Sequence, residues 1–213
     1  MYLPSHFEES RPHVLRAFVA SHPLGLLVTQ NRAGGVDANS VPFFLDALDD
    51  ATPGVLRAHV ARANPLWKEA RDDVDALVVF QGAHGYVSPA WYPSKAEHGK
   101  VVPTWNYVMV QARGRLRAID DKAWLRAFVT RLTDHHEAGR SAPWAVSDAP
   151  ADFIEATLGA IVGIEIALSS LVGKWKVSQN RAAADRAGVV DGLLRERDDA
   201  ALASEVRAPG GGA

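Results

Sequence analysis

Residues 104–119 alternate between apolar and polar side chains along most of their length, and this pattern restricts the fold more than any other in the chain. The apolar side chains occupy even positions: Val108, Val110, Ala112, Leu116 and Ala118. Three arginines occupy odd positions: Arg113, Arg115 and Arg117. Because successive side chains of a β-strand point to opposite faces, we expect a long strand whose two faces differ in polarity.

The other strand signals lie close together along the chain. They predict strands at residues 24–30, 36–45, 55–60, 75–80 and 162–168, with a turn at 31–35. Helices are predicted at 12–20, from a cap at Asp120 to Gly139, at 150–160 and over most of 181–206. Strands that pair locally, with helices in separate blocks, favour α+β over alternating βαβ units. We therefore expect a small antiparallel β-barrel with peripheral helices.

Composition agrees with a globular protein. The chain has 213 residues, 47% of them hydrophobic, and we expect residues 1–207 to form a single domain with a C-terminal helical extension, followed by a disordered tail at 208–213. The lack of cysteine excludes disulfides and thiolate sites. Because there is no signal-peptide pattern and no apolar run of about 20 residues, we expect a cytoplasmic protein without a membrane span. The net charge of −2 argues against a broad DNA-binding face.

A first candidate binding site lies at residues 59–67, which include His59. Asn64 and Pro65 are typical of a helix start, and a helix start offers free N–H groups and a positive dipole end to an anion. Arg62 adds a guanidinium that can bind a phosphate through two hydrogen bonds. The alternative is an ordinary strand-to-helix turn with a surface arginine, and the spacing alone favours that alternative.

A second candidate site lies at residues 81–107. Its segment 88–103 is longer than an ordinary connection of about 4–6 residues but is rich in aromatic side chains, so we expect an ordered loop that lines a site for a flat, anionic ligand. The candidate contacts are Gln81, Ser88, Trp91, Lys95, Lys100 and Trp105. Such a set suits an isoalloxazine or a nucleotide. The alternative is that the tryptophans are core or dimer-interface residues.

A third cluster surrounds Trp175 and contributes Lys174, Lys176 and Gln179, which either close over a ligand or form a solvated turn. No metal site is expected, because adjacent histidines such as His135 and His136 point about 100° apart on a helix. No G-x-S-x-G elbow is present, and no hydrolytic triad can be assembled. Redox or transfer chemistry would therefore have to come from a cofactor.

Six motifs follow one another over about residues 1–190. They are Met1-Tyr2-x-Pro4-x-His6-Phe7, His22-Pro23-Leu24-Gly25, His59-Val60-Ala61-Arg62-Ala63-Asn64-Pro65, Tyr86-Val87-Ser88-Pro89-x-Trp91-Tyr92, Lys100-Val101-Val102-Pro103-Thr104-Trp105-Asn106-Tyr107 and Gly173-Lys174-Trp175-Lys176-x-Ser178-Gln179-Asn180-Arg181. Together they resemble the PaiB family, described as FMN-binding negative transcriptional regulators. The resemblance implies an FMN-binding split barrel, usually a homodimer with flavin sites at the subunit interface.

The same resemblance extends to the candidate sites. It favours a phosphate site at Arg62 and Pro65, because related split barrels bind the flavin phosphate beside a strand-to-helix junction. By the same analogy, Trp105 and residues 174–180 reach the flavin from the other subunit. These residues are expected contacts of FMN, the predicted cofactor.

Two classes of function stay open. The first is a dimeric FMN flavoprotein, either an FMN-dependent oxidoreductase acting on a small molecule or a negative transcriptional regulator. The second is a regulator that binds DNA or a protein partner and uses the barrel as a scaffold without flavin chemistry. A heme-binding split barrel with His59, His84 or His98 as axial ligand is a third, less favoured option.

Overall fold

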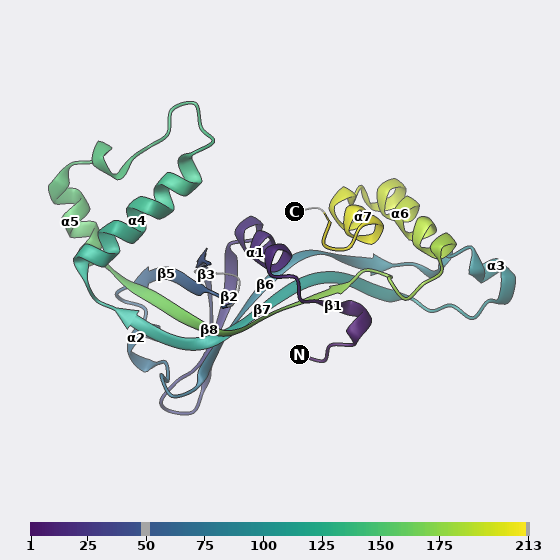
Figure 1. Ribbon diagram of the computed structural model, residues 1–213, viewed down its shortest axis with the longest axis horizontal. Coiled ribbons are helices and arrows are strands. Elements are labelled where there is room, and N and C mark those ends of the chain that lie inside the picture. The colour runs from purple at the N-terminus through teal and green to yellow at the C-terminus, as the bar shows by residue number, and fades with distance from the viewer. Residues whose placement is uncertain (48–51, 212–213) are drawn as a thin grey trace. The chain divides into compact units, whose positions relative to one another are not determined.

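The computed structural model describes residues 1–47 and 52–211, and the chain divides into two compact units. Unit 1 comprises Met1–His22, Val79–Gln111 and Leu171–Ala213, and unit 2 comprises Pro23–Val78 and Ala112–Ser170. Three strands contribute residues to both units: β6 (Asp75–Val87), β7 (Thr104–Ile119) and β8 (Ile161–Lys176) (Figure 1). The single domain expected from the sequence stays a prediction.

Among the described residues, the strands form one eight-stranded sheet in the order β3-β2-β6-β7-β8-β5-β4, and β1 pairs with β8. The pairings of β2 with β3 and of β5 with β4 and β8 are antiparallel. Separate helices accompany the sheet in each unit. The predicted α+β class is therefore confirmed.

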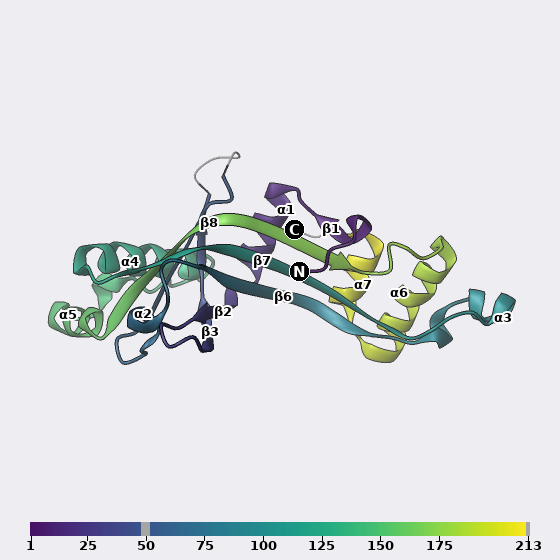
Figure 2. The ribbon, with the colours of Figure 1, turned by 90° about the horizontal axis from the view of Figure 1, so that it is seen from below.

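Unit 1 surrounds its parts of the long strands with short helical elements. These are η1 (Ser5–Phe7), α1 (Pro12–Ser21), η2 (Pro89–Trp91), α3 (Ser94–His98), α6 (Ala183–Arg197) and α7 (Ala200–Arg207), and the strand β1 (Glu8–Glu9) belongs to the same unit. Helix α1 begins at Pro12, where the missing N–H needs no partner, and buries Val14, Leu15, Phe18 and Val19. Helices α6 and α7 lie side by side (Figure 2), and Asp199 begins α7 by accepting a hydrogen bond from Leu202 N at 2.9 Å.

Unit 2 contains most of the short strands and the helices α4 and α5. Its elements are β2 (Leu24–Gln30), β3 (Val36–Pro42), β4 (Phe44–Asp46), β5 (Val55–Ala61), α2 (Leu66–Glu69), α4 (Lys122–Glu137), η3 (Val146–Asp148) and α5 (Ala151–Gly159). Helices α4 and α5 share an apolar cluster of Leu125, Val146, Ile154 and Leu158. This cluster holds the pair of helices together by burying their apolar faces.

The bounds of β7 and of the early helix agree with the predicted patterns, but β6 and β8 run further than expected. Strand β6 continues from residue 80 to Val87, and β8 continues from residue 168 to Lys176. Glycines at 82, 85 and 173 weaken the strand signal in these segments. Gln81 therefore lies within a strand, and Lys174 and Lys176 lie on a strand and not in a turn.

Three other predicted boundaries need correction. The predicted strand 36–45 is two strands, β3 and β4, because the chain leaves the ladder after Pro42, which has no N–H to donate. The cap of α4 is Asp121, whose carboxylate accepts from Trp124 N at 2.7 Å, and not Asp120. Asp120 instead binds Arg62. The segment 88–103 is not irregular throughout, because it contains η2 and α3.

The C-terminal segment is described as far as Gly211. Gly210 is buried, and its N–H donates to Glu205 Oε2 at 3.3 Å, while Arg11 Nη2 donates to Pro209 O at 3.3 Å. Of the predicted disordered tail, residues 212–213 lie outside the described residues. No helix in the described part of the chain is long and apolar enough to cross a membrane.

Candidate functional site

Unit 1 contains a cavity of about 310 Å³ that we call the Trp105 pocket. Its lining residues come from β6 and β7: Gln81, Gly82, His84, Trp105, Tyr107, Val108 and Met109. The volume lies near the lower end of the roughly 300–1,000 Å³ that is usual for small-molecule sites. The pocket therefore has room for part of a cofactor or for a small ligand.

The alternation of buried and exposed residues changes partway along β6, and this change determines which polar residues line the pocket. Phe80 is buried and Gln81 is exposed, but further along the strand the buried positions are Gly85 and Val87. The phase changes at Gly82, which packs on Phe18 of α1: a Cβ at Gly82 would lie 2.7 Å from Phe18 Cε2. Phe18 therefore occupies the space where a side chain at position 82 would lie, and Gln81 lies beside it in the lining.

Trp105 supplies the flat surface of this pocket. Its side chain is 49% exposed, which is unusual for a tryptophan. The ring stacks with His84 at a centroid distance of 6.1 Å and an interplanar angle of 23°, and Tyr86 meets it edge-on at 6.4 Å. An exposed indole supported from one side is a suitable surface for stacking a planar ligand.

Two lysines of β8 lie next to the strand that carries Trp105. Lys176 Nζ donates to Thr104 Oγ1 at 2.7 Å and to Trp105 O at 2.5 Å. Burial, and then the charges of Lys174 and Arg181, lower the pKa of Lys176. Lys174 is buried, and its Nζ donates to Tyr2 O at 2.9 Å and lies 5.4 Å from the centroid of the Tyr107 ring. Lys176 thus holds the backbone at Trp105 and leaves positive charge close to it.

The remaining predicted residues of unit 1 do not line the Trp105 pocket. Ser88 Oγ accepts from Ala90 N at 3.1 Å and starts η2, so its role in the structure is a helix cap. Lys95 and Lys100 are exposed. Gln179 is occupied with backbone groups, accepting from Val177 N at 2.8 Å and donating to Trp175 O. A role for these four in cofactor binding stays a prediction.

Trp91 belongs to the core of unit 1. It is 8% exposed, and a Cβ at Gly192 of α6 would lie only 2.2 Å from Trp91 Cδ2. The ring thus packs directly on the backbone of α6, where a ligand could not stack on it. The sequence left open whether this tryptophan contacts a ligand or belongs to the core or a dimer interface, and the structure favours the core.

Arg62 in unit 2 is engaged by the protein itself. Its guanidinium binds the Asp120 carboxylate through two hydrogen bonds of 2.5 and 2.8 Å, and its Nε donates to Gly159 O at 2.6 Å. The hydrogen bond and charge of Asp120 raise the pKa of Arg62, and Arg62 in turn lowers the pKa of Asp120. A phosphate at Arg62 would have to replace or share Asp120, so phosphate binding there stays a prediction.

Asn64 lines a second cavity, of about 540 Å³, together with Asn39. Asn64 Nδ2 donates to Asn39 Oδ1 at 3.0 Å, and Asn64 Oδ1 accepts from Leu66 N at 2.9 Å. The helix that follows, α2, has only four residues. Its dipole is correspondingly small, and the carboxylates of Asp37 and Glu69 line the same cavity. The small dipole and the two carboxylates argue against the anion site that the sequence predicts at residues 64–65.

His59 on β5 is a partly buried base. In the described part of the chain, its Nδ1 is buried without a hydrogen-bond partner, and burial lowers the pKa of the ring. Its ring meets Phe128 of α4 edge-on at 6.3 Å. The histidine therefore stays neutral in the folded protein at pH values where the unfolded chain already binds a proton.

Acidification is therefore expected to destabilise the protein through His59. Below its ordinary pKa of 6.5 the unfolded state gains a proton that the folded state resists, so the stability present above pH 6.5 is lost as the pH falls. Urea unfolding of wild type and His59→Leu at about pH 7 and about pH 5.5 measures this. The wild type should lose more stability than the variant on acidification, whereas the exposed His13→Leu control should follow the wild type. Equal losses in all three proteins would contradict the prediction.

Comparison with known proteins identifies the family. Residues 1–170 match the family model described as "Putative FMN-binding domain". The chain belongs to this FMN-binding family. An uncharacterized protein of Aspergillus fumigatus is 34% identical over 91% of this chain and 90% of its own length. The protease synthase and sporulation protein PAI 2 of Bacillus subtilis is 29% identical over 93% of this chain and 91% of its own.

A solved structure supports the fold. The flavocytochrome Anf3 from Azotobacter vinelandii superposes with a TM-score of 0.56 at 18% identity, over 79% of this chain and 69% of that one. The resemblance to the PaiB family and the split-barrel fold class predicted from the sequence are thus confirmed. Membership of the FMN-binding family also confirms FMN as the cofactor.

Sequence reasoning missed four lining residues of the Trp105 pocket: His84, Tyr107, Val108 and Met109. Trp105, Tyr107 and Met109 occupy odd positions of β7, so the alternation that predicted this strand also predicts that they share a face. His84 gave no comparable signal, because the length of β6 was underestimated. Among residues 1–47 and 52–211, no group of three or more histidine, aspartate and glutamate side chains is arranged to hold a metal ion.

Proposed function

We propose that this FMN-binding family member is a homodimeric flavoprotein that stacks its flavin ring on Trp105 and supports oxidation or reduction of a small molecule. The observation that carries the proposal is the Trp105 pocket, where an exposed indole faces a cavity that also has polar groups. The negative regulatory role belongs to the same proposal only through the likeness to PAI 2 of Bacillus subtilis, at 29% identity.

The lining of the pocket fits the chemistry of a flavin. An isoalloxazine is planar and has one apolar and one polar edge, so it needs a flat surface, an apolar contact and a few hydrogen-bonding groups. Trp105 provides the surface, Val108 and Met109 the apolar contact, and the Gln81 amide the hydrogen-bonding groups.

The exposure of Trp105 and of the tyrosine beside it supports a dimer. Trp105 is 49% exposed, and Tyr86, whose ring meets it edge-on, is 40% exposed. Contiguous exposed apolar side chains are typical of protein–protein or ligand contacts. A second copy of the chain that covers this face would shield the flavin from water.

When bound, FMN supplies the electron-transfer chemistry. The protein residues bind and orient it: Trp105 stacks against the ring, Gln81 offers its amide to the polar edge, and Lys176 anchors the Trp105 backbone. The partly buried ammonium of Lys176 also places positive charge near the ring, where it favours the anionic form of a bound ligand.

Comparing FMN with riboflavin, which lacks the phosphate, tests how the cofactor is held. Wild type should retain FMN through gel filtration and bind it in a one-to-one fluorescence-quenching titration. Lys176→Gln is expected to weaken FMN binding by about tenfold through the lost charge. Lys122→Gln serves as the control, because Lys122 is an exposed lysine of unit 2 that pairs with Glu155 and belongs to no predicted cofactor site. Arg62→Ala, measured against both flavins, decides whether that residue contacts the phosphate.

The outcomes separate the parts of the proposal. A wild type that binds neither flavin would overturn the flavoprotein function. A wild type that binds FMN, with Lys176→Gln unchanged, would leave the function intact and remove the lysine from the site. Size-exclusion chromatography with light scattering, with and without FMN, tests the dimer.

A regulator without flavin chemistry is the second candidate, and the likeness to PAI 2 is what favours it. The arginines of β7 give it little support: Arg115 pairs with Asp75 at 3.2 Å and Arg117 with Glu165 at 2.8 Å, so their charges are partly neutralised. Binding to the gene's own upstream DNA that falls steeply with salt would support direct regulation, and the absence of binding at low salt would refute it.

A further inference from the structure

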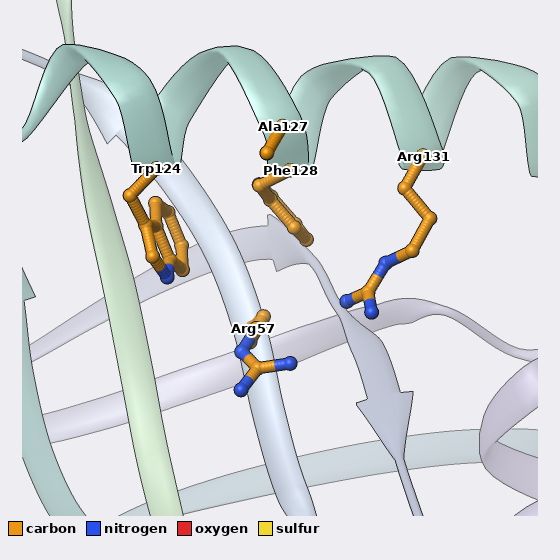
Figure 3. A pocket seen from close by; sticks show the side chains of 5 residues that line it. All are labelled: Arg57, Trp124, Ala127, Phe128 and Arg131. Carbon is orange, nitrogen blue, oxygen red and sulfur yellow. The ribbon is translucent and has the colours of Figure 1, made fainter.

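Unit 2 contains a cavity of about 280 Å³ that belongs to none of the sites above. It lies between β5 and α4, and its lining residues are Arg57, Trp124, Ala127, Phe128 and Arg131. Figure 3 shows Trp124, Phe128 and Arg131 projecting from α4 toward Arg57 on the strand below. We call this cavity the arginine pocket.

One wall of the arginine pocket is a pair of stacked aromatic rings. Trp124 and Phe128 are four residues apart on α4 and therefore lie on the same face of the helix. Their ring centroids are 5.1 Å apart with an interplanar angle of 24°. The tryptophan is seated on β8, because a Cβ at Gly163 would lie 2.3 Å from Trp124 Cζ3. The wall is thus a fixed aromatic surface.

The other groups at the cavity are two guanidiniums that share one carboxylate. Arg57 Nη1 and Arg131 Nη2 both donate to Asp46 Oδ2, the second at 2.7 Å, and Arg57 Nε donates to Glu165 Oε2 at 2.9 Å. Arg117 also pairs with Glu165. Among the described residues around the pocket, three guanidiniums therefore face two carboxylates, and the balance of these five groups is positive.

Donors remain for a further anion. Within the described part of the chain, no acceptor contacts Arg57 Nη2 or the Nε and Nη1 of Arg131. The Arg57 side chain is 24% exposed and that of Arg131 46%, so one guanidinium is largely desolvated and the other is accessible. Arg131 also lies 4.7 Å from the centroid of the Phe44 ring, a contact that helps to hold it at the mouth of the cavity.

An ordinary structural role would have the arginines simply fasten α4 to β4 and β5 through Asp46. That role explains the ion pairs, but it accounts neither for the open cavity beside them nor for the aromatic side chains and spare donors that line it. Guanidinium groups match carboxylates through two parallel hydrogen bonds, and stacked aromatic rings select planar ligands. The small volume excludes a whole dinucleotide.

We propose that the arginine pocket is a second ligand site, which binds a small planar aromatic carboxylate. The carboxylate pairs with the free donors of Arg57 and Arg131, and the aromatic ring lies against Trp124 and Phe128. The proposal does not depend on flavin binding, since none of its residues lines the Trp105 pocket.

Calorimetric titration of the full-length protein with benzoate tests the chemistry. Two analogues serve as controls: cyclohexanecarboxylate keeps the charge and loses the flat ring, and benzamide keeps the ring and loses the charge. Benzoate is expected to bind saturably with a Kd of about 1 mM or below, and each analogue about tenfold more weakly. No saturable binding of benzoate would overturn the proposal, and so would equal binding of all three compounds.

A matched pair of substitutions on α4 tests the location. Arg131→Gln should weaken benzoate binding by about tenfold, while Arg126→Gln should leave benzoate binding unchanged. Arg126 lies on the same helix and is 44% exposed, close to the 46% of Arg131, but it pairs with Glu155 away from the cavity. Equal effects of the two substitutions would overturn the site. Benzoate should also bind the FMN-saturated protein; displacement by FMN would show that the pocket is not a separate site.

Discussion

Replacing Trp105 by alanine is expected to weaken FMN binding by about 10- to 100-fold, because stacking of a flat heterocycle on an aromatic side chain contributes about 1–3 kcal/mol. The indole is half exposed in unit 1 and lines the pocket with Gln81 and Tyr107. Its removal deletes the flat surface but few contacts in the core. Riboflavin should lose as much affinity as FMN, since the stacked ring is common to both.

Fluorescence-quenching titrations of wild type, Trp105→Ala and Trp144→Ala with both flavins measure this effect. Trp144 is the matched control, because it is 46% exposed, close to the 49% of Trp105, and lies in unit 2. Trp105→Phe should recover most of the affinity by restoring a planar ring. If Trp105→Ala bound both flavins as tightly as wild type, the ring would have to lie elsewhere and the Trp105 pocket would lose its assignment.

Replacing Trp91 by alanine is expected to lower the free energy of unfolding by about 3–5 kcal/mol, the usual loss when a buried tryptophan is truncated. The ring is 8% exposed and lies against the backbone of α6 at Gly192. Its removal leaves a cavity between η2 and α6 that a helix backbone cannot fill. Urea unfolding followed by circular dichroism gives the change directly.

The milder Trp91→Phe variant separates stability from ligand binding. It should stay folded, lose part of the stability and bind FMN with wild-type affinity, because Trp91 does not line the Trp105 pocket. A variant with wild-type stability but weakened FMN binding would restore Trp91 to the cofactor site that its sequence context suggested. Trp144→Ala again serves as the control, with a change in stability within about 0.5 kcal/mol.

Much of the secondary structure could be predicted because its signals are local. The alternation at residues 104–119 sets β7, and the apolar face that follows Pro12 sets α1. The prediction stopped short in β6 and β8, where glycines interrupt the apolar pattern. Those glycines are compatible with a strand because neighbouring side chains occupy the space, as Phe18 does at Gly82.

The sequence predicted the kind of ligand site, but it predicted only some of the residues that line it. The aromatic and basic composition of residues 81–107 indicated a site for a planar ligand, and Gln81 and Trp105 do line one pocket. Composition could not separate Trp105 from Trp91, which differ in exposure and not in chemical type. It could not show that Arg62 is already paired with Asp120, because that contact joins residues far apart in the chain.

The order of apolar, polar, glycine and proline residues was enough to set the α+β class, most of the strands and the family to which the chain belongs. These properties depend on short-range periodicity and on motifs, which can be read along the chain. Tertiary contacts decided which tryptophan is buried, which lysine holds the backbone of Trp105, and that α4 meets β5 around two arginines. Such contacts arise when distant segments pack together, and no pattern within either segment specifies its partner.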